Sequence, residues 1–169
     1  TLLHLSITRG RLMAAAGRDN DQNNGGMLAV IAPLDELEDL IKENKTGVVL
    51  ANRNSPNQGV LSGSTDAINR AEKLCKKNGF RTVMLPVSAA FHSSLVKEAQ
   101  KPFSREIEKI DFFPSQIPVF SNTTGAPYPA DSEKVKELLG KHLLSPVDFI
   151  SEINNLFKVG ARTFVEVGP

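Results

Sequence analysis

Helix-like and strand-like patterns of apolar residues alternate along the whole chain. Apolar residues at three- and four-residue spacing predict helices, and short apolar runs bounded by Gly or Pro predict strands. Asp35 and residues 64–66 are suited to cap helices, and Asn78-Gly79 is suited to end one. In chain order, the sequence predicts a helix over 1–16, a strand over 27–32, a helix capped by Asp35, strands over 48–52 and 58–62, a helix from 64–66 through 77, a strand over 80–87, a helix over 93–110, a strand over 119–122, helices over 132–143 and 146–158, and a final strand over 163–167.

The order β-α-β-β-α-β over residues 27–87 is the ferredoxin-like pattern, with a turn at 54–57 joining its two middle strands. The strands and helices outside it belong to an α/β layer. We therefore predict an α/β fold in which a ferredoxin-like subdomain, residues 26–88, is inserted in a body formed by 1–25 and 89–169. The first helix has no cap and the chain ends after a predicted strand, so we expect a piece of a larger protein.

Composition excludes several classes of protein. The 169 residues carry a formal net charge of +1, which gives no broad footprint for nucleic acid. Cys75 is the one cysteine, so an internal disulfide and a thiolate metal cluster are both excluded, and its helical context predicts a small buried side chain. No apolar run approaches the ~20 residues of a membrane span, and no signal peptide is visible, so we expect a cytosolic protein without membrane contact.

The loop after the strand at 80–87 carries His92, one of three histidines. Loops at strand ends often hold catalytic groups, and histidine is the usual general base near neutral pH. A capping or core role for His92 stays open. No Gly-x-Ser-x-Gly elbow supplies a nucleophile, because residues 59–63 have the wrong spacing. No phosphate-binding glycine loop and no metal-ligand spacing is present either. We interpret His4 and His142, on helical patterns, as structural or solvated.

Four segments together resemble the acyltransferase domain of fatty acid and polyketide synthases, the malonyl-CoA:acyl-carrier-protein transacylase family. They are Arg9-Gly10-Arg11-Leu12-Met13, Asn54-Ser55-Pro56-Asn57-Gln58 with Ser62-Gly63, Pro86-Val87-Ser88 with Phe91-His92, and Glu166-Val167-Gly168-Pro169. The resemblance covers nearly the whole chain and implies an α/β-hydrolase-like body, here partial, with an inserted ferredoxin-like subdomain. Residues 119–125 and 127–129 further resemble large iterative synthases, including the polyunsaturated fatty acid type.

The resemblance also implies roles for individual residues. His92 would be the catalytic base, and Arg9 would bind the malonyl carboxylate through two parallel hydrogen bonds. Phe91 would favour malonyl over methylmalonyl by filling the room that an α-methyl group needs. Asn54 would lie with Gln58 at the rim of the cleft, where turn chemistry alone also explains it. Helix surface is the alternative for Arg9, and core packing is the alternative for Phe91.

In this family the nucleophilic serine lies in a Gly-His-Ser-x-Gly elbow some two dozen residues before the Arg-Gly pair. That stretch would precede Thr1, so we expect the chain to be inactive alone. The implied function is malonyl loading from malonyl-CoA onto an acyl carrier protein, through an acyl-serine and beside a ketosynthase. No cofactor or metal is expected, only the CoA thioester and the carrier phosphopantetheine. The alternatives are a non-catalytic ferredoxin-like binding module and a Ser/His acyl hydrolase.

Overall fold

A computed structural model describes residues 2–16, 25–87 and 89–167. Ser88 and Gly168-Pro169, which belong to the segments of resemblance, lie outside the described residues. The helices are α1 (Leu2–Ala16), α2 (Leu34–Glu43), α3 (Thr65–Lys77), the 3₁₀ helix η1 (Ser94–Val96), α4 (Lys97–Glu108), α5 (Ser132–Lys141) and α6 (Phe149–Lys158). The strands are β1 (Gly26–Ile31), β2 (Val49–Ser55), β3 (Gln58–Gly63), β4 (Arg81–Leu85), β5 (Phe120–Ser121), β6 (Ala126–Pro127) and β7 (Val147–Asp148).

The main sheet has the strand order β4-β1-β3-β2-β7. Its first three pairings are antiparallel, and β7 adds to β2 in parallel. The predicted β-α-β-β-α-β succession is confirmed by β1 to β4 with α2 and α3. Local chemistry explains the boundaries: the Ser64 side chain accepts a hydrogen bond from the Ala67 backbone N–H at the start of α3, and Gly79 follows its end with φ +79°.

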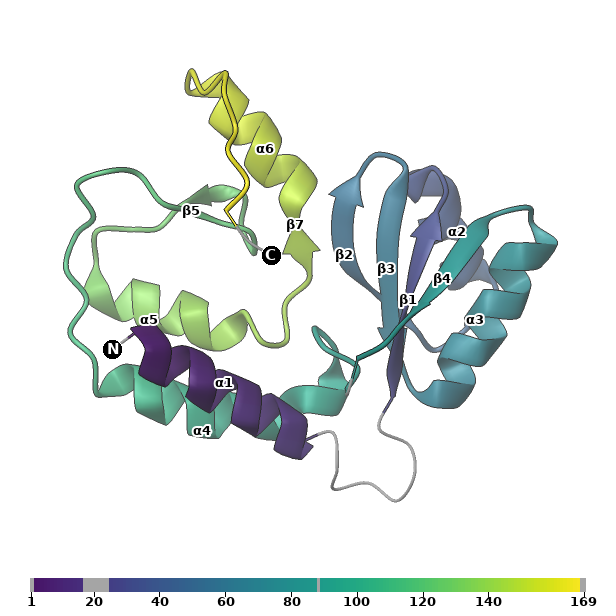
Figure 1. The fold of residues 1–169 in the computed structure, drawn as a ribbon, viewed down its shortest axis with the longest axis horizontal. Coiled ribbons are helices and arrows are strands. Elements are labelled where there is room, and N and C mark those ends of the chain that lie inside the picture. Colours follow the sequence, from purple (N-terminus) through teal and green to yellow (C-terminus); the bar gives the residue numbers. More distant parts are fainter. Residues whose placement is uncertain (1, 17–24, 88, 168–169) are drawn as a thin grey trace.

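Helices α2 and α3 pack on one face of this sheet, at the right of Figure 1. Alternate residues of β1 decide what each face buries. Leu28 and Val30 enter a core with Leu37 of α2 and Ile68 of α3. Met27, on the opposite face, packs in a second, smaller cluster. The helices therefore cover only one face of the sheet.

A separate helical layer, formed by α1, α4 and α5, lies to the left of the sheet in Figure 1. Its core holds Met13 of α1, Phe103 and Ile107 of α4, and Leu143 beyond α5. Phe91 packs both against this core and against the cluster around Met27. Phe91 therefore lies where the helical layer meets the sheet.

Several details differ from the sequence predictions. Asp35 does not cap α2: Pro33 is the N-cap residue, without a side-chain hydrogen bond, and Asp35 lies in the first turn. Residues 163–167 form no strand, and Val165 is 80% exposed. Helix α6 begins later than predicted, because Val147–Asp148 pairs with β2 instead. An extended segment becomes a strand only beside a hydrogen-bonding neighbour, and local pattern does not reveal that neighbour.

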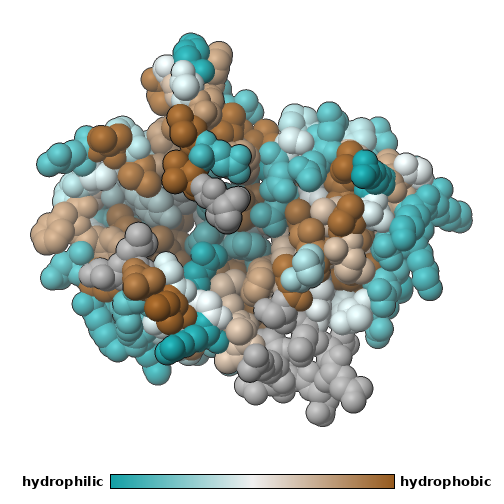
Figure 2. All heavy atoms as spheres, in the orientation of Figure 1, coloured by the Kyte–Doolittle hydropathy of each residue, from teal (hydrophilic) through white to brown (hydrophobic). Residues whose placement is uncertain are grey.

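Apolar side chains also lie on the surface of the described residues. Figure 2 shows them over α6 and over the strands of the sheet. Ile31 and Val83 are about half exposed on the sheet, as is Phe157 on α6. Among the helices that the structure describes, none combines the length and apolar character that a membrane crossing requires.

Candidate active site

His92 follows β4 in the segment that leads into η1, and its backbone lies in the left-handed region with φ +56°. That conformation is uncommon for residues other than glycine and is concentrated at functional sites. Local hydrogen bonds hold it: the Ser93 hydroxyl donates to the Ala90 carbonyl at 2.6 Å and accepts from the Leu95 N–H at 3.3 Å. The chain thus maintains a strained backbone at the predicted base.

The imidazole of His92 is oriented by the segment after α5. Its Nδ1 lies 2.9 Å from the carbonyl oxygen of Ser145 and 3.2 Å from that of His142. Carbonyl oxygens only accept hydrogen bonds, so Nδ1 carries the proton and Nε2 keeps a lone pair in the neutral ring. This is the tautomer that a general base needs.

Burial and charge keep the His92 ring neutral. Burial lowers the pKa of His92 below its ordinary value of 6.5, and the nearby positive charge of Arg9 lowers it further. The hydrogen bonds to the Ser145 and His142 carbonyls act in the opposite direction. The net shift is downward, so His92 is available as a base at neutral pH.

Arg9 lies on α1 and is half-buried. Burial lowers the pKa of its guanidinium, and Tyr128 opposes that shift. Its Nε is buried without a hydrogen-bond partner, and no carboxylate of the described residues pairs with it. A half-buried cation without a counter-ion has lost part of its hydration, so this guanidinium is suited to an incoming anion. Arg11, two residues further, is exposed.

An open pocket of about 340 Å³ brings three of the predicted residues together. It is lined by Ser6, Arg9, Gly10, Met13, Phe91 and His92. An imidazole, a cation and an aromatic side chain therefore border one space, which makes this pocket a candidate site for an anionic ligand.

Asn54, the fourth predicted residue, is not part of this lining. The prediction of a turn over 54–57 was too broad: Asn54 lies half-buried in β2, and Pro56 and Asn57 alone form the turn. The pairing of β2 with β3 continues to Ser55, opposite Gln58, with register shifts between Leu50 and Asn52 and between Arg53 and Ser55. A substrate role for Asn54 stays a prediction.

The structure also places a second histidine beside His92. His142, interpreted from sequence as structural or solvated, is half-buried at the end of α5, and its ring centroid lies 5.4 Å from that of His92. Burial, Arg9 and His92 lower the pKa of His142 to about 4. Fifty residues separate the two histidines, so no local pattern could have paired them. His4, in contrast, is exposed and pairs with Glu106 at 3.5 Å.

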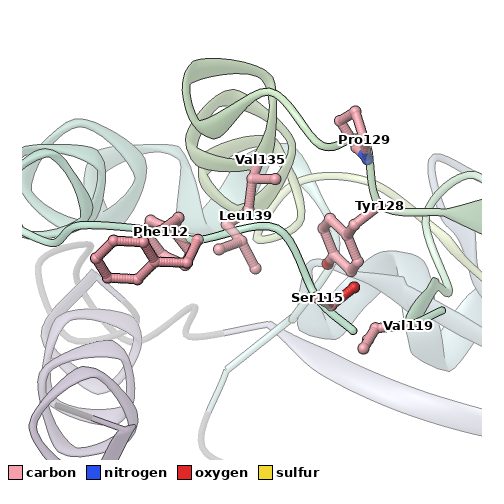
Figure 3. Close-up of a pocket in the computed structure, with 8 residues that line it drawn as sticks. Phe112, Ser115, Val119, Tyr128, Pro129, Val135 and Leu139 are labelled. Atoms are coloured by element: carbon pink, nitrogen blue, oxygen red, sulfur yellow. The ribbon is translucent and has the colours of Figure 1, made fainter. Parts of the chain in front are cut away.

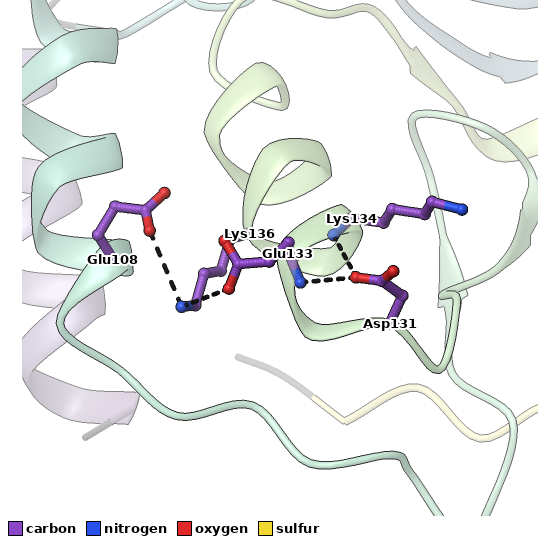
Figure 4. Close-up of polar contacts among 5 residues, drawn as sticks. All are labelled: Glu108, Asp131, Glu133, Lys134 and Lys136. Atoms are coloured by element: carbon purple, nitrogen blue, oxygen red, sulfur yellow. Dashed lines mark hydrogen bonds and ion pairs between the residues drawn. The ribbon is translucent and has the colours of Figure 1, made fainter.

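Polar contacts fix the helix that carries His142. At its start, the Asp131 carboxylate accepts hydrogen bonds from the backbone N–H groups of Glu133 and Lys134 at 2.9 and 3.2 Å (Figure 4). The Lys136 ammonium lies 2.9 Å from the Glu133 carboxylate and 3.8 Å from that of Glu108 on α4. Helix α5 is thus tied to α4, and its far end presents His142 to His92.

An apolar pocket of about 260 Å³ lies between α5 and the segment that precedes β5 (Figure 3). Its lining comprises Phe112, Phe113, Ser115, Val119, Tyr128, Pro129, Val135 and Leu139. None of the predicted site residues is among them. The pocket of Arg9 and His92 is therefore the candidate active site.

Comparison with known proteins shows the family to which the chain belongs. The sequence model of the family described as "Acyl transferase domain" matches residues 3–169. The polyketide biosynthesis protein ThaF of Burkholderia thailandensis is 39% identical over 170 residues, which cover 98% of this chain and 14% of that protein. The malonyl CoA-acyl carrier protein transacylase of Bacillus subtilis is 36% identical over 150 residues, which cover 86% of this chain and 47% of that protein.

A solved structure has the same fold: MCAT from Streptococcus pneumoniae aligns with a TM-score of 0.85 and 30% identity, over 98% of this chain and 54% of that one. The fold and the pocket define an α/β protein in which the His92 imidazole and the Arg9 guanidinium border one space. With the matches above, the chain belongs to the acyl transferase domain family. It spans less than half the length of ThaF and of the Bacillus subtilis transacylase.

Proposed function

We propose that this chain supplies the base and the acyl-binding arginine of an acyltransferase that loads malonyl units from malonyl-CoA onto an acyl carrier protein. The observation that carries the proposal is that Arg9 and His92 line one pocket. The names of two relatives support the proposal: one is a malonyl CoA-acyl carrier protein transacylase, and the other is a polyketide biosynthesis protein.

The proposed chemistry is covalent and uses His92 twice. Nε2 takes the proton of a serine hydroxyl as that oxygen attacks the thioester carbonyl, and it returns a proton to the departing CoA sulfur, leaving malonyl-serine. The phosphopantetheine thiol then gives its proton to Nε2, and its sulfur attacks the carbonyl carbon of the malonyl-serine ester. The ester bond breaks, the serine oxygen takes the proton back from Nε2, and the malonyl group remains on the carrier thiol. The 169 residues hold no Gly-x-Ser-x-Gly elbow, so no residue of this chain is assigned as that serine.

Arg9 and Phe91 would select the acyl group. The guanidinium offers two parallel N–H donors to the free malonyl carboxylate, which acetyl lacks. Phe91, packed against both layers, narrows the pocket beside the base. These two contacts favour malonyl over acetyl and over methylmalonyl.

The finer architecture belongs to the same proposal. The strand order β4-β1-β3-β2 supports a ferredoxin-like subdomain at 26–88, and we infer that 1–25 and 89–169 belong to a hydrolase-like body. The expected partners are malonyl-CoA, a carrier protein with its phosphopantetheine, and a neighbouring ketosynthase. The cytosolic location stays a prediction, as do the expected absences of nucleic acid, membrane and cofactor.

A transfer assay tests the proposal on the full-length protein. Malonyl-CoA and a phosphopantetheinylated carrier protein are supplied, and malonyl-carrier protein and free malonate are measured by mass spectrometry. We expect malonyl-carrier protein as the main product. Free malonate as the main product would indicate an acyl hydrolase instead, and the absence of both products would indicate a binding module.

A further inference from the structure

His142 meets the predicted base at two points. Its main-chain carbonyl lies 3.2 Å from Nδ1 of His92, and its ring is tilted by 48° against the His92 ring at a centroid distance of 5.4 Å. The second contact involves the side chain, and the roles implied by the resemblance do not include it. Its own Nε2 is buried and has no hydrogen-bond partner in the described part of the chain.

The His92 ring needs support from outside its own residue. Its backbone is held at φ +56°, and rotation of an imidazole about its last torsion has a broad, roughly two-fold profile. The two carbonyl oxygens direct the Nδ1–H bond, but they contact only one edge of the ring. A tilted aromatic neighbour restricts that plane, because aromatic pairs prefer particular geometries at centroid distances of about 4.5–7 Å.

The charge on His142 matters as much as its shape. Burial, Arg9 and His92 lower its pKa to about 4, so the ring is neutral where His92 works as a base. Arg9 is the charged side chain of the described residues that acts on both imidazoles. A neutral ring adds no second positive charge next to the imidazolium that His92 becomes during transfer.

We propose that the imidazole of His142 is a positioning residue for His92, holding the catalytic ring so that Nδ1 stays on the two carbonyls and Nε2 stays directed at the reacting atoms. The proposal rests on the acyl transfer proposed above. In this proposal the flat ring of His142 orients His92, and the unpartnered Nε2 of His142 takes no part. A phenylalanine at position 142 should therefore orient His92 equally well.

Two substitutions in the full-length protein separate ring contact from general packing. His142→Ala removes the ring, and His142→Phe keeps it. We expect His142→Ala to lower kcat by about 10- to 100-fold, the loss typical of a misplaced catalytic group, with KM for malonyl-CoA unchanged. We expect the acidic limb of its kcat/KM profile to move to higher pH, because water then reaches His92. His142→Phe should stay close to the original protein in both respects, and His4→Ala, at an exposed histidine, serves as the matched control.

A second measurement does not depend on turnover. Nitrogen-15 NMR of the imidazoles reports the His92 tautomer and pKa directly, and we expect His142→Ala to lose the protected Nδ1–H signal while His142→Phe keeps it. Unchanged kcat, pH profile and Nδ1–H signal in His142→Ala would overturn the proposal. Equal losses in both variants would also overturn it, because they would assign the role to Nε2. An unmodified protein that transfers no malonyl would instead refute the proposed function and leave the NMR result to decide on His142.

Discussion

Replacing Arg9 tests the acyl-binding pocket most sharply. The guanidinium is half-buried, its Nε has no partner, and no carboxylate of the described residues pairs with it, so a substrate carboxylate is its natural counter-ion. A hydrogen bond to a charged group contributes ~1.5–3 kcal/mol. Since 1.4 kcal/mol is about tenfold, losing one such bond in Arg9→Ala should lower kcat/KM for malonyl-CoA by about 10- to 150-fold, and losing both should lower it more. Arg9→Lys keeps the charge without the fork and should lie between.

The assay compares malonyl-CoA with acetyl-CoA in the full-length protein. Acetyl carries no carboxylate, so its transfer should change little and the malonyl-to-acetyl ratio should collapse. Arg11→Ala, at an exposed arginine two residues away, is the matched control and should keep the original ratio. An unchanged ratio in Arg9→Ala, with Arg9→Ala folded by circular dichroism, would refute the carboxylate role.

Three further predictions concern selectivity and stability. Phe91→Ser should raise the methylmalonyl-to-malonyl ratio of kcat/KM by about tenfold or more, because one methyl group is worth ~1–3 kcal/mol, and a constant ratio would assign Phe91 to packing alone. Acid should destabilise the fold through His142, because the pKa of this side chain falls from 6.5 in the unfolded chain to about 4 in the folded one. As the pH falls through this range, the unfolded chain binds the proton before the folded chain does. The free energy of unfolding should therefore decrease between about pH 6.5 and about pH 4. Urea titrations should show a shallower drop in His142→Phe than in His4→Phe, and equal slopes would contradict the cause. Gly125→Ala should lower the unfolding free energy by ~1–2 kcal/mol or more, because φ is +63° and the new Cβ would lie 2.8 Å from Cβ of Ser151; an unchanged urea midpoint would contradict it.

Local signals predicted most of the fold correctly. Helical spacing located α1, α3, α4 and α5, and the cap at Ser64 and the glycine after Asn78 marked the ends of α3. Long-range pairing was not predictable in this way. Val147–Asp148 was assigned to a helix because its parallel pairing with β2, more than ninety residues away, leaves no trace in its own sequence.

In the site, too, the sequence identified individual residues but not their contacts with distant parts of the chain. The loop after a predicted strand drew attention to His92, the resemblance added Arg9 and Phe91, and the structure places all three around one pocket. The sequence could not say what orients the His92 ring, because the answer is two main-chain carbonyls, and any residue type can supply a carbonyl. The contact between the His142 and His92 rings was not predictable either, because fifty residues separate the two histidines in the sequence.

The most direct test of the account is formation of the acyl-enzyme in a single turnover. The full-length protein and its His92→Ala variant are mixed with malonyl-CoA, and intact mass is followed over time. The account predicts a malonyl adduct that forms about 10²- to 10⁴-fold more slowly without His92, the contribution typical of a positioned general base. Equal rates in the two proteins, or an adduct on neither, would contradict it.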